Sequence, residues 1–272
     1  MKKDNNEAEI LLREELDAGI LRVTMNDPRR RNALSLEMIR QLSDAIYNAS
    51  LNQKINVIII AASAPTFCAG HDLKEMTIAR ERADGGNAFY AKLFSNCSAL
   101  MQLIIDNSKP VIAEVSGIAT AAGCQLVASC DLAIASDQAA FATPGVNIGL
   151  FCSTPMVALS RNVANKHAME MLLTGEMIDA NKAKEIGLVN HVVNEVDLLE
   201  RTMKLAVLIA SKSSVTVSHG KKTFYRQLDQ PLKEAYKLCS EVMVNNMLEN
   251  EAKEGIDAFI NKRLPNWNIE DD

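Results

Sequence analysis

The chain has 272 residues, 48% of them hydrophobic, so it is long enough to bury a large core. Its 29 basic and 34 acidic residues give a formal net charge of −5, which argues against a nucleic-acid-binding protein that relies on a broad basic surface. An α/β fold of this length is often one domain. We therefore expect a compact protein in which any attraction for phosphate groups is local.

The six cysteines show no spacing typical of metal ligands, and most lie in apolar or small-residue runs where a reduced, buried thiol is the ordinary state. This indicates a reducing compartment. Residues 1–7 contain no apolar signal core and are too acidic for a transit peptide, and no apolar run approaches membrane-spanning length. We expect no membrane span and a cytoplasmic protein, or a mitochondrial-matrix protein if a transit peptide has been removed.

In chain order, strands are predicted over 9–16 and 20–26, followed by a helix over 36–49 that is capped by Ser35. A buried strand over 55–62, a helix over 87–105 and a strand over 110–116 come next. The repeated unit is strand, strand, helix. On periodicity alone the fold class is α/β.

From Ala180 onward the pattern becomes helical, with segments near 197–211, 214–228, 232–248 and 250–263. Amphipathic helices of this kind need a second surface against which to bury their apolar stripes. We divide the chain into a core over 1–195 and a helical region over 196–272.

Two motifs stand where a predicted strand meets a helix. The first is Pro65-Thr66-Phe67-Cys68-Ala69-Gly70-His71-Asp72-Leu73-Lys74, and the second runs from Lys109 through Gly117 to Ala121-Ala122-Gly123-Cys124-Gln125. Each places backbone N–H groups of small residues at a helix N-terminus, where unpaired donors and the helix dipole favour negative charge. Two such corners that face each other form an oxyanion hole. A tight turn that needs small residues is the simpler alternative for either corner alone.

These residues resemble the crotonase superfamily, the enoyl-CoA hydratases and isomerases, and within it the members that lack both catalytic glutamates. The blocks that match, in family order from about Ile20 to Lys262, are Arg31-Asn32-Ala33-Leu34, the two corners, residues 130–135, Leu173-Thr174-Gly175 and residues 254–259. The resemblance implies a stacked β-β-α spiral with a C-terminal helical trimerisation region. It also implies an acyl-CoA thioester as substrate or ligand, no other cofactor and no metal, and a homotrimer or a dimer of trimers.

By position in the family motifs, the oxyanion donors are the backbone N–H groups of His71 and Ala122. The resemblance further implies substrate or CoA contacts from Arg29, Arg31, Ala33, Cys68, Gly70, His71, Asp72, Leu73, Lys74, Gly123, Phe259 and Lys262. Arginine binds phosphate by bidentate hydrogen bonds, although a solvated loop is an equal alternative for each arginine. Asp72 is expected to cap the next helix, and the imidazole of His71 is a weaker candidate for a general base than its main chain is for a donor.

Hydratases of the family use two glutamates, whose positions match Gln125 and Gly145, and neither residue transfers a proton near neutral pH. Gly145 is expected to leave empty volume, so glutamate at both positions should raise hydratase activity. Cys152-Ser153-Thr154 is a candidate for the wall of the acyl pocket. Glu114, which alternates with apolar residues on its strand, is expected to be exposed or at an interface.

Three functions follow from this pattern. The first is an acyl-CoA-binding member of fatty-acid and acyl-CoA metabolism, a lyase by resemblance, with weak or no standard hydratase activity. The second is a binder of acyl-CoA without turnover. The third is a naphthoate-synthase-like enzyme that forms carbon–carbon bonds, since those members also have glycine at the second glutamate position; against it, Thr143 replaces the glutamine that helps to hold their bicarbonate base.

Overall fold

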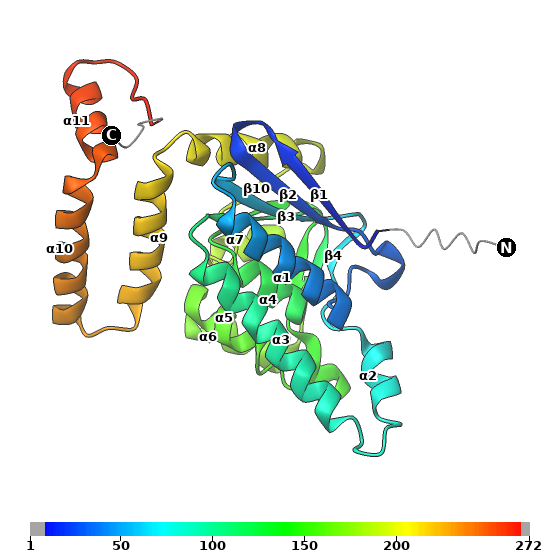
Figure 1. Ribbon diagram of the computed structural model, residues 1–272. Helices are drawn as coiled ribbons and strands as arrows, with labels where there is room; N and C mark the ends of the chain where they lie inside the picture. Colours follow the sequence, from blue (N-terminus) through cyan, green and yellow to red (C-terminus); the bar gives the residue numbers. More distant parts are fainter. Residues whose placement is uncertain (1–8, 268–272) are drawn as a thin grey trace.

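The computed structural model describes residues 9–267, and it confirms the α/β class (Figure 1). The expectation about residues 1–7 lies outside this range. A six-stranded sheet has the order β1 (Leu11–Leu16), β2 (Ile20–Met25), β3 (Val57–Ala62), β5 (Val111–Val115), β7 (Leu132–Ser136) and β10 (His191–Val193). Only β1 is antiparallel to its neighbour.

A second sheet has the order β4 (Thr66–Cys68), β6 (Ile118–Thr120), β8 (Ala140–Ala142) and β9 (Ile178–Asp179). Each repeat of the chain contributes one strand to the first sheet and the next strand to the second, as in β3–β4, β5–β6 and β7–β8. The predicted repeat of strand, strand and helix is therefore present as a spiral with two sheets. The parallel pairing of β4 with β6 sets the two corner motifs next to each other.

The helices in the first two thirds of the chain are α1 (Leu36–Leu51), α2 (Leu73–Ala79), α3 (Asn87–Asp106), α4 (Ala122–Ser129), α5 (Pro155–Asn162), α6 (Asn165–Thr174) and α7 (Ala180–Glu185). Ser35 caps α1, as predicted, because its Oγ accepts the Met38 N–H at 3.1 Å. The remaining helices are α8 (Leu198–Ala210), α9 (Ser214–Leu228), α10 (Leu232–Leu248) and α11 (Asn250–Ile260), close to the predicted ranges. In Figure 1, α9 and α10 lie side by side next to the core.

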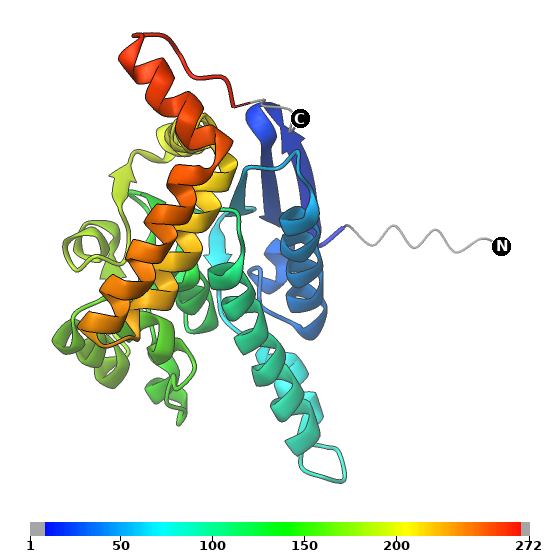
Figure 2. The ribbon, with the colours of Figure 1, turned by 60° about the vertical axis from the view of Figure 1, so that its left-hand side comes forward.

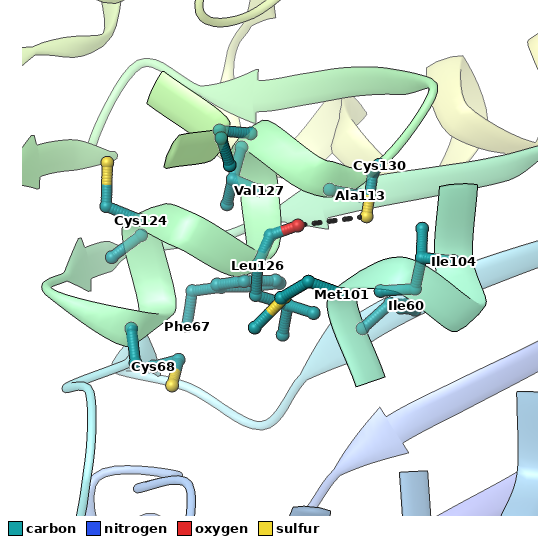
Figure 3. Close-up of a cluster of buried hydrophobic side chains, with 14 of the residues drawn as sticks. Ile60, Phe67, Cys68, Met101, Ile104, Ala113, Cys124, Leu126, Val127 and Cys130 are labelled. Carbon is teal, nitrogen blue, oxygen red and sulfur yellow. Dashed lines mark hydrogen bonds between the residues drawn. The ribbon is translucent and has the colours of Figure 1, made fainter. Parts of the chain in front are cut away.

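Both faces of the first sheet are covered, which explains why its central strands are apolar at nearly every position. One face packs against α1 and α3 through residues such as Val23, Ile58 and Ile60. The other face packs against α8 through Ile20, Val57 and Ile59. Figure 3 shows part of the core, where Phe67 and Cys68 of β4 lie near Leu126 and Val127 of α4. This packing holds the start of α4 against the end of β4.

Two expectations are wrong. Glu114 is buried, because Arg22 reaches across β3 to place Nη2 2.6 Å from its carboxylate. Helix α3 has 20 residues and is long and apolar enough to cross a membrane, whereas no run was expected to reach that length. A core helix meets the same criterion, and α3 buries Leu93, Cys97 and Leu100 in the main core.

Candidate active site

The first corner joins β4 to α2. Gly70 makes the turn with a φ of +90°, a conformation that side chains with a Cβ rarely adopt. The Leu34 N–H donates to the Gly70 carbonyl at 2.8 Å and ties the turn to the loop before α1. Asp72 caps α2, as expected, because its Oδ1 accepts the N–H groups of Lys74 at 2.8 Å and Glu75 at 3.2 Å. These bonds fix the peptide that carries the His71 N–H.

The second corner joins β6 to α4. Ala121 has a φ of 50° and a ψ of −116°, which is an unfavourable conformation for a residue other than glycine. The Ala121 N–H donates to the Ala142 carbonyl at 2.9 Å, and the Gln125 N–H donates to the Ala121 carbonyl at 3.0 Å. The surrounding structure therefore holds Ala121 in this conformation and sets the direction of the next N–H, that of Ala122.

The two corners are in direct contact. A Cβ at Gly123 would lie 2.2 Å from the Cys68 carbonyl oxygen, and a Cβ at Gly70 would lie 3.0 Å from the Ala121 Cβ and 3.4 Å from the Ala122 nitrogen. Close approach therefore requires glycine at 123, and the positive φ favours it at 70. Among the backbone bonds of residues 9–267, no acceptor takes the N–H of His71 or Ala122. Two N–H groups without a backbone acceptor in residues 9–267 therefore lie on adjoining corners.

A cavity of about 480 Å³ opens beside these donors. Its walls are mostly apolar and come from α2, α3, the start of α4 and the segment between β8 and α5. The lining residues are Ala69, His71, Leu73, Met76, Phe94, Ala121, Ala122, Pro144, Gly145, Asn147, Ile148, Leu150, Phe151, Cys152, Ser153, Thr154 and Pro155. This set contains no carboxylate. Within the described part of the chain, no three His, Cys, Asp or Glu side chains are grouped to hold a metal.

His71 is fixed and uncharged at neutral pH. Its Nδ1 lies 3.2 Å from the Leu34 carbonyl oxygen, and its ring meets the Phe94 ring edge-on with centroids 5.4 Å apart. Burial lowers the pKa of the imidazole below its ordinary value, and the contact with Leu34 opposes this only in part. Nδ1 therefore carries the hydrogen. Nε2 is buried and has no hydrogen-bond partner in residues 9–267.

Residues 15–270 of the chain match the family described as enoyl-CoA hydratase/isomerase. The chain is a member of that family. Enoyl-CoA hydratase domain-containing protein 3, mitochondrial, of Mus musculus is 51% identical over 249 residues, which cover 92% of this chain and 81% of the mouse protein. The Danio rerio protein of the same name is 45% identical over 272 residues, or 100% of this chain and 92% of the fish protein.

Solved structures agree with this assignment. An enoyl-CoA hydratase of Mycobacterium smegmatis superposes with a TM-score of 0.91 at 44% identity, covering 96% of this chain and 100% of that chain. Human enoyl coenzyme A hydratase domain-containing protein 3 also superposes with a TM-score of 0.91, at 49% identity, covering 95% of this chain and 100% of that chain. The resemblance read from the motifs is confirmed for the family and for the crotonase fold.

Gln125 and Gly145, which were expected at the two glutamate positions, have different surroundings. Gln125 is 4% exposed and does not line the cavity, and its Oε1 has no partner in the described chain. Gly145 lines the cavity, but a Cβ there would lie 2.7 Å from the Leu150 carbonyl oxygen and 2.9 Å from the Cys152 sulfur. The expectation of empty volume at Gly145 is therefore wrong. A glutamate at this position would first have to displace the backbone of the loop.

The predicted CoA contacts fall into three groups. Leu73 lines the cavity, and Lys74 is exposed at the start of α2. Arg29 and Arg31 are exposed and have no ion pair in residues 9–267, whereas Arg30 is paired with Asp27 at 3.6 Å and Asp72 at 3.5 Å. The predicted residues that are buried are Ala33, Cys68, Gly70, Asp72 and Gly123.

Phe259 and Lys262 are not brought to this cavity. Helix α11, which ends at Ile260, lies at the opposite end of the molecule from α2 in both views (Figures 1 and 2). Phe259 is 85% exposed. A contact between these residues and a ligand in the cavity would require a second copy of the chain.

Cys152, Ser153 and Thr154 line the cavity, as predicted, but other parts of the wall were not predicted. Met76 and Phe94 project from α2 and α3, and Ile148 and Leu150 belong to the segment before α5. Met76 follows Leu73 by one helical turn, so a shared face of α2 was a usable signal. The loop residues carry no such signal, because only the folded spiral brings them to the corners.

Proposed function

We propose that the protein binds CoA thioesters with an apolar acyl group, and that its place is in acyl-CoA metabolism. The observation that carries this proposal is the pair of unpaired N–H donors of His71 and Ala122 beside an apolar cavity. Negative charge that collects on a thioester oxygen is stabilised by about 3 kcal/mol per fixed donor in a site with little water. The apolar walls suit a hydrocarbon chain and exclude most water from the carbonyl.

The nucleotide end of the ligand is assigned to the loop at Arg29 and Arg31. Both guanidinium groups lack a carboxylate partner in the described chain, so they are available for phosphate. Asn32 anchors this loop to the first corner, because its Nδ2 donates to the carbonyls of Ser63 at 2.8 Å and Thr66 at 2.7 Å. The phosphate contacts and the oxyanion donors are thereby held on one support.

We assign weak or no standard hydratase activity to this site. The cavity wall contains no carboxylate, and hydration of an enoyl thioester needs a group that activates water and a group that delivers a proton. With crotonyl-CoA, loss of absorbance of the conjugated thioester should be at least about 100-fold slower than with an ordinary hydratase of the family. A rate equal to that of such an enzyme would contradict the assignment.

Two further proposals come from the relatives and the surface. Several relatives are named as mitochondrial proteins, and we propose the same compartment for this chain.

Exposed apolar side chains on α10 and α11, among them Leu232, Tyr236, Met243 and Phe259, support assembly into a trimer or a dimer of trimers. In such an assembly Phe259 and Lys262 would contact the ligand of a neighbouring subunit. The division of the chain at residue 196 remains a prediction.

The binding proposal is tested by calorimetry with a matched pair of ligands. Octanoyl-CoA has the thioester carbonyl, and the thioether S-octyl-CoA has the same chain and nucleotide without it. We expect both to bind and octanoyl-CoA to bind about 30-fold more tightly, since two neutral hydrogen bonds contribute about 1 kcal/mol each. Arg31→Ala should weaken both ligands, whereas Arg161→Ala on α5 should weaken neither. Equal affinities for octanoyl-CoA and S-octyl-CoA would contradict the oxyanion site. Absence of binding at millimolar ligand would contradict the whole proposal.

A further inference from the structure

The Cys152 sulfur fills the space in the cavity wall that a side chain on residue 145 would need. Cys152 is 7% exposed and lines the cavity together with His71, Ala122 and Gly145. The sulfur lies 2.9 Å from the place of a Cβ on Gly145. Any larger residue at 145 would therefore overlap the thiol, and glycine leaves the thiol at the surface of the cavity.

The loop that carries Cys152 is held on both sides. The Leu150 N–H donates to the Gly145 carbonyl at 2.9 Å, which folds the loop back on itself. The Cys152 carbonyl accepts the Met156 N–H at 2.9 Å at the start of α5. The sulfur is thus fixed relative to Gly145 by the backbone on either side of it.

Only two side chains in the cavity wall titrate in the accessible pH range, His71 and Cys152. The one hydrogen of the neutral His71 imidazole is bonded to the Leu34 carbonyl, whereas Nε2 has no hydrogen-bond partner in residues 9–267 and is a weak base because burial lowers the pKa of the ring. The remaining polar side chains of the wall, Asn147, Ser153 and Thr154, do not exchange protons near neutral pH. Cys152 is therefore the group of the wall whose own hydrogen is available to a bound ligand, and its thiolate is a stronger base than the His71 imidazole.

The thiol is protonated at neutral pH. Burial raises the pKa of Cys152, and the nearby Gly145 N–H opposes this effect only in part. The titratable neighbours are the Cys124 thiol of α4, which burial holds at a pKa of about 12, and the uncharged His71. The wall itself includes no Lys, Arg, Asp or Glu. A protonated thiol is a far stronger acid than the α-carbon of a thioester, so proton transfer from sulfur to an enolate carbon is favourable.

We propose that Cys152 is a catalytic residue that exchanges a proton with the α-carbon of a bound acyl-CoA, while the His71 and Ala122 N–H groups hold the enolate oxygen. In one direction the thiol first gives its proton to solvent, and then the Cα–H bond breaks, its proton forms a new S–H bond, and the negative charge of the thiolate moves to the enolate oxygen. In the other direction the S–H proton returns to Cα and the charge returns to sulfur. No oxidant, reductant or metal takes part. This inference rests on the proposed binding of acyl-CoA thioesters.

The experiment measures deuterium uptake at the α-carbon of octanoyl-CoA in D₂O by mass spectrometry, with binding measured separately by calorimetry. We expect the protein to catalyse exchange, with a rate that rises between pH 7 and 9.5 because proton removal from Cα requires the thiolate. Cys152→Ser should lower the exchange rate at least about 100-fold. Its affinity for octanoyl-CoA should change less than threefold. Cys152→Ala serves as a second variant, and Cys239→Ser on α10 is the matched control that keeps the full rate.

Each other outcome has a defined meaning. Exchange at the parental rate in folded Cys152→Ser or Cys152→Ala would overturn the role of the thiol. Binding of octanoyl-CoA by the parent without exchange above the buffer rate would overturn the inference and leave the proposed function intact. Absence of binding would remove the proposed function, and the inference with it.

Discussion

A single buried side chain, Asn32, joins the loop at Arg29–Arg31 to the first corner. Its Oδ1 accepts the Asp27 N–H at 2.8 Å, and its Nδ2 donates to two carbonyls, those of Ser63 and Thr66. Its backbone also has a φ of 51°, which asparagine tolerates better than most residues. Asn32→Ala removes these side-chain hydrogen bonds, and it leaves the carbonyls of Ser63 and Thr66 without their donor.

We expect Asn32→Ala to lower the free energy of unfolding by about 3 kcal/mol and to weaken octanoyl-CoA binding in the folded fraction. Urea denaturation at pH 7.5 measures the first effect and calorimetry the second. Asn52→Ala, a substitution in the turn after α1, is the matched control. A loss below about 1 kcal/mol in Asn32→Ala would show that the loop is held by other contacts.

His71 should make stability depend on pH. Burial depresses its folded-state pKa, so between that value and the ordinary pKa near 6.5 the unfolded chain binds more protons. The contribution of His71 is therefore complete above the unfolded pKa and is lost as the pH falls below it. Urea midpoints should decrease from pH 7.5 to pH 5, and His71→Phe should flatten this dependence. An equal slope in His71→Phe and the parent would contradict this account.

At the scale of the element, α9 is attached to the core by one buried ammonium group. Lys221 Nζ lies 2.7 Å from Asp131 Oδ2 and donates to the carbonyls of Ile104 at 2.8 Å and Lys109 at 2.9 Å. Tyr225, one turn further along α9, donates its hydroxyl to Asp131 Oδ1 at 2.9 Å. The lysine therefore satisfies the ends of α3 and of the loop before β5 as well as the aspartate.

We expect Lys221→Met to destabilise the protein by about 3 kcal/mol, because it leaves the half-buried Asp131 without its cation. Urea denaturation measures the loss. The double variant Lys221→Met with Asp131→Asn should lose less than the sum of the two single variants, since the two side chains are coupled. Lys222→Met, at the neighbouring exposed position of α9, should change stability by less than about 0.5 kcal/mol. Additive losses would show that α9 is attached mainly by its apolar contacts.

The helices, the two corners and the part of the far cavity wall at Cys152–Thr154 were predictable, whereas the rest of that wall was not. Periodicity, Ser35 and Asp72 mark helix starts through local interactions, so α1, α2 and the C-terminal helices agree with expectation. The return of the loop at Leu150 onto Gly145 depends on the folded chain around it. For the same reason, the space at Gly145 and the burial of Glu114 by Arg22 were misjudged. Local chemistry places elements, and long-range packing decides which side chains share a cavity.

At the scale of the whole molecule, the C-terminal helices present more apolar surface than one chain covers. On α10, Tyr236 and Met243 are 68% and 62% exposed, and they lie seven residues apart on one side of the helix. Beyond α11, Leu264 is 90% exposed. Monomers rarely expose apolar side chains in such continuous rows, whereas obligate interfaces bury them.

Sedimentation equilibrium should therefore give three or six times the chain mass of 29.8 kDa. Tyr236→Glu with Met243→Glu should shift the protein towards the monomer, because the interface would bury two unpaired charges. Lys237→Glu, which alters charge at the adjacent exposed position of α10, is the matched control and should keep the assembly. Since Phe259 and Lys262 are remote from the cavity of their own chain, the dissociated variant should also bind octanoyl-CoA more weakly. A folded monomer with parental affinity would show that each chain holds its ligand alone and that these C-terminal residues take no part in binding.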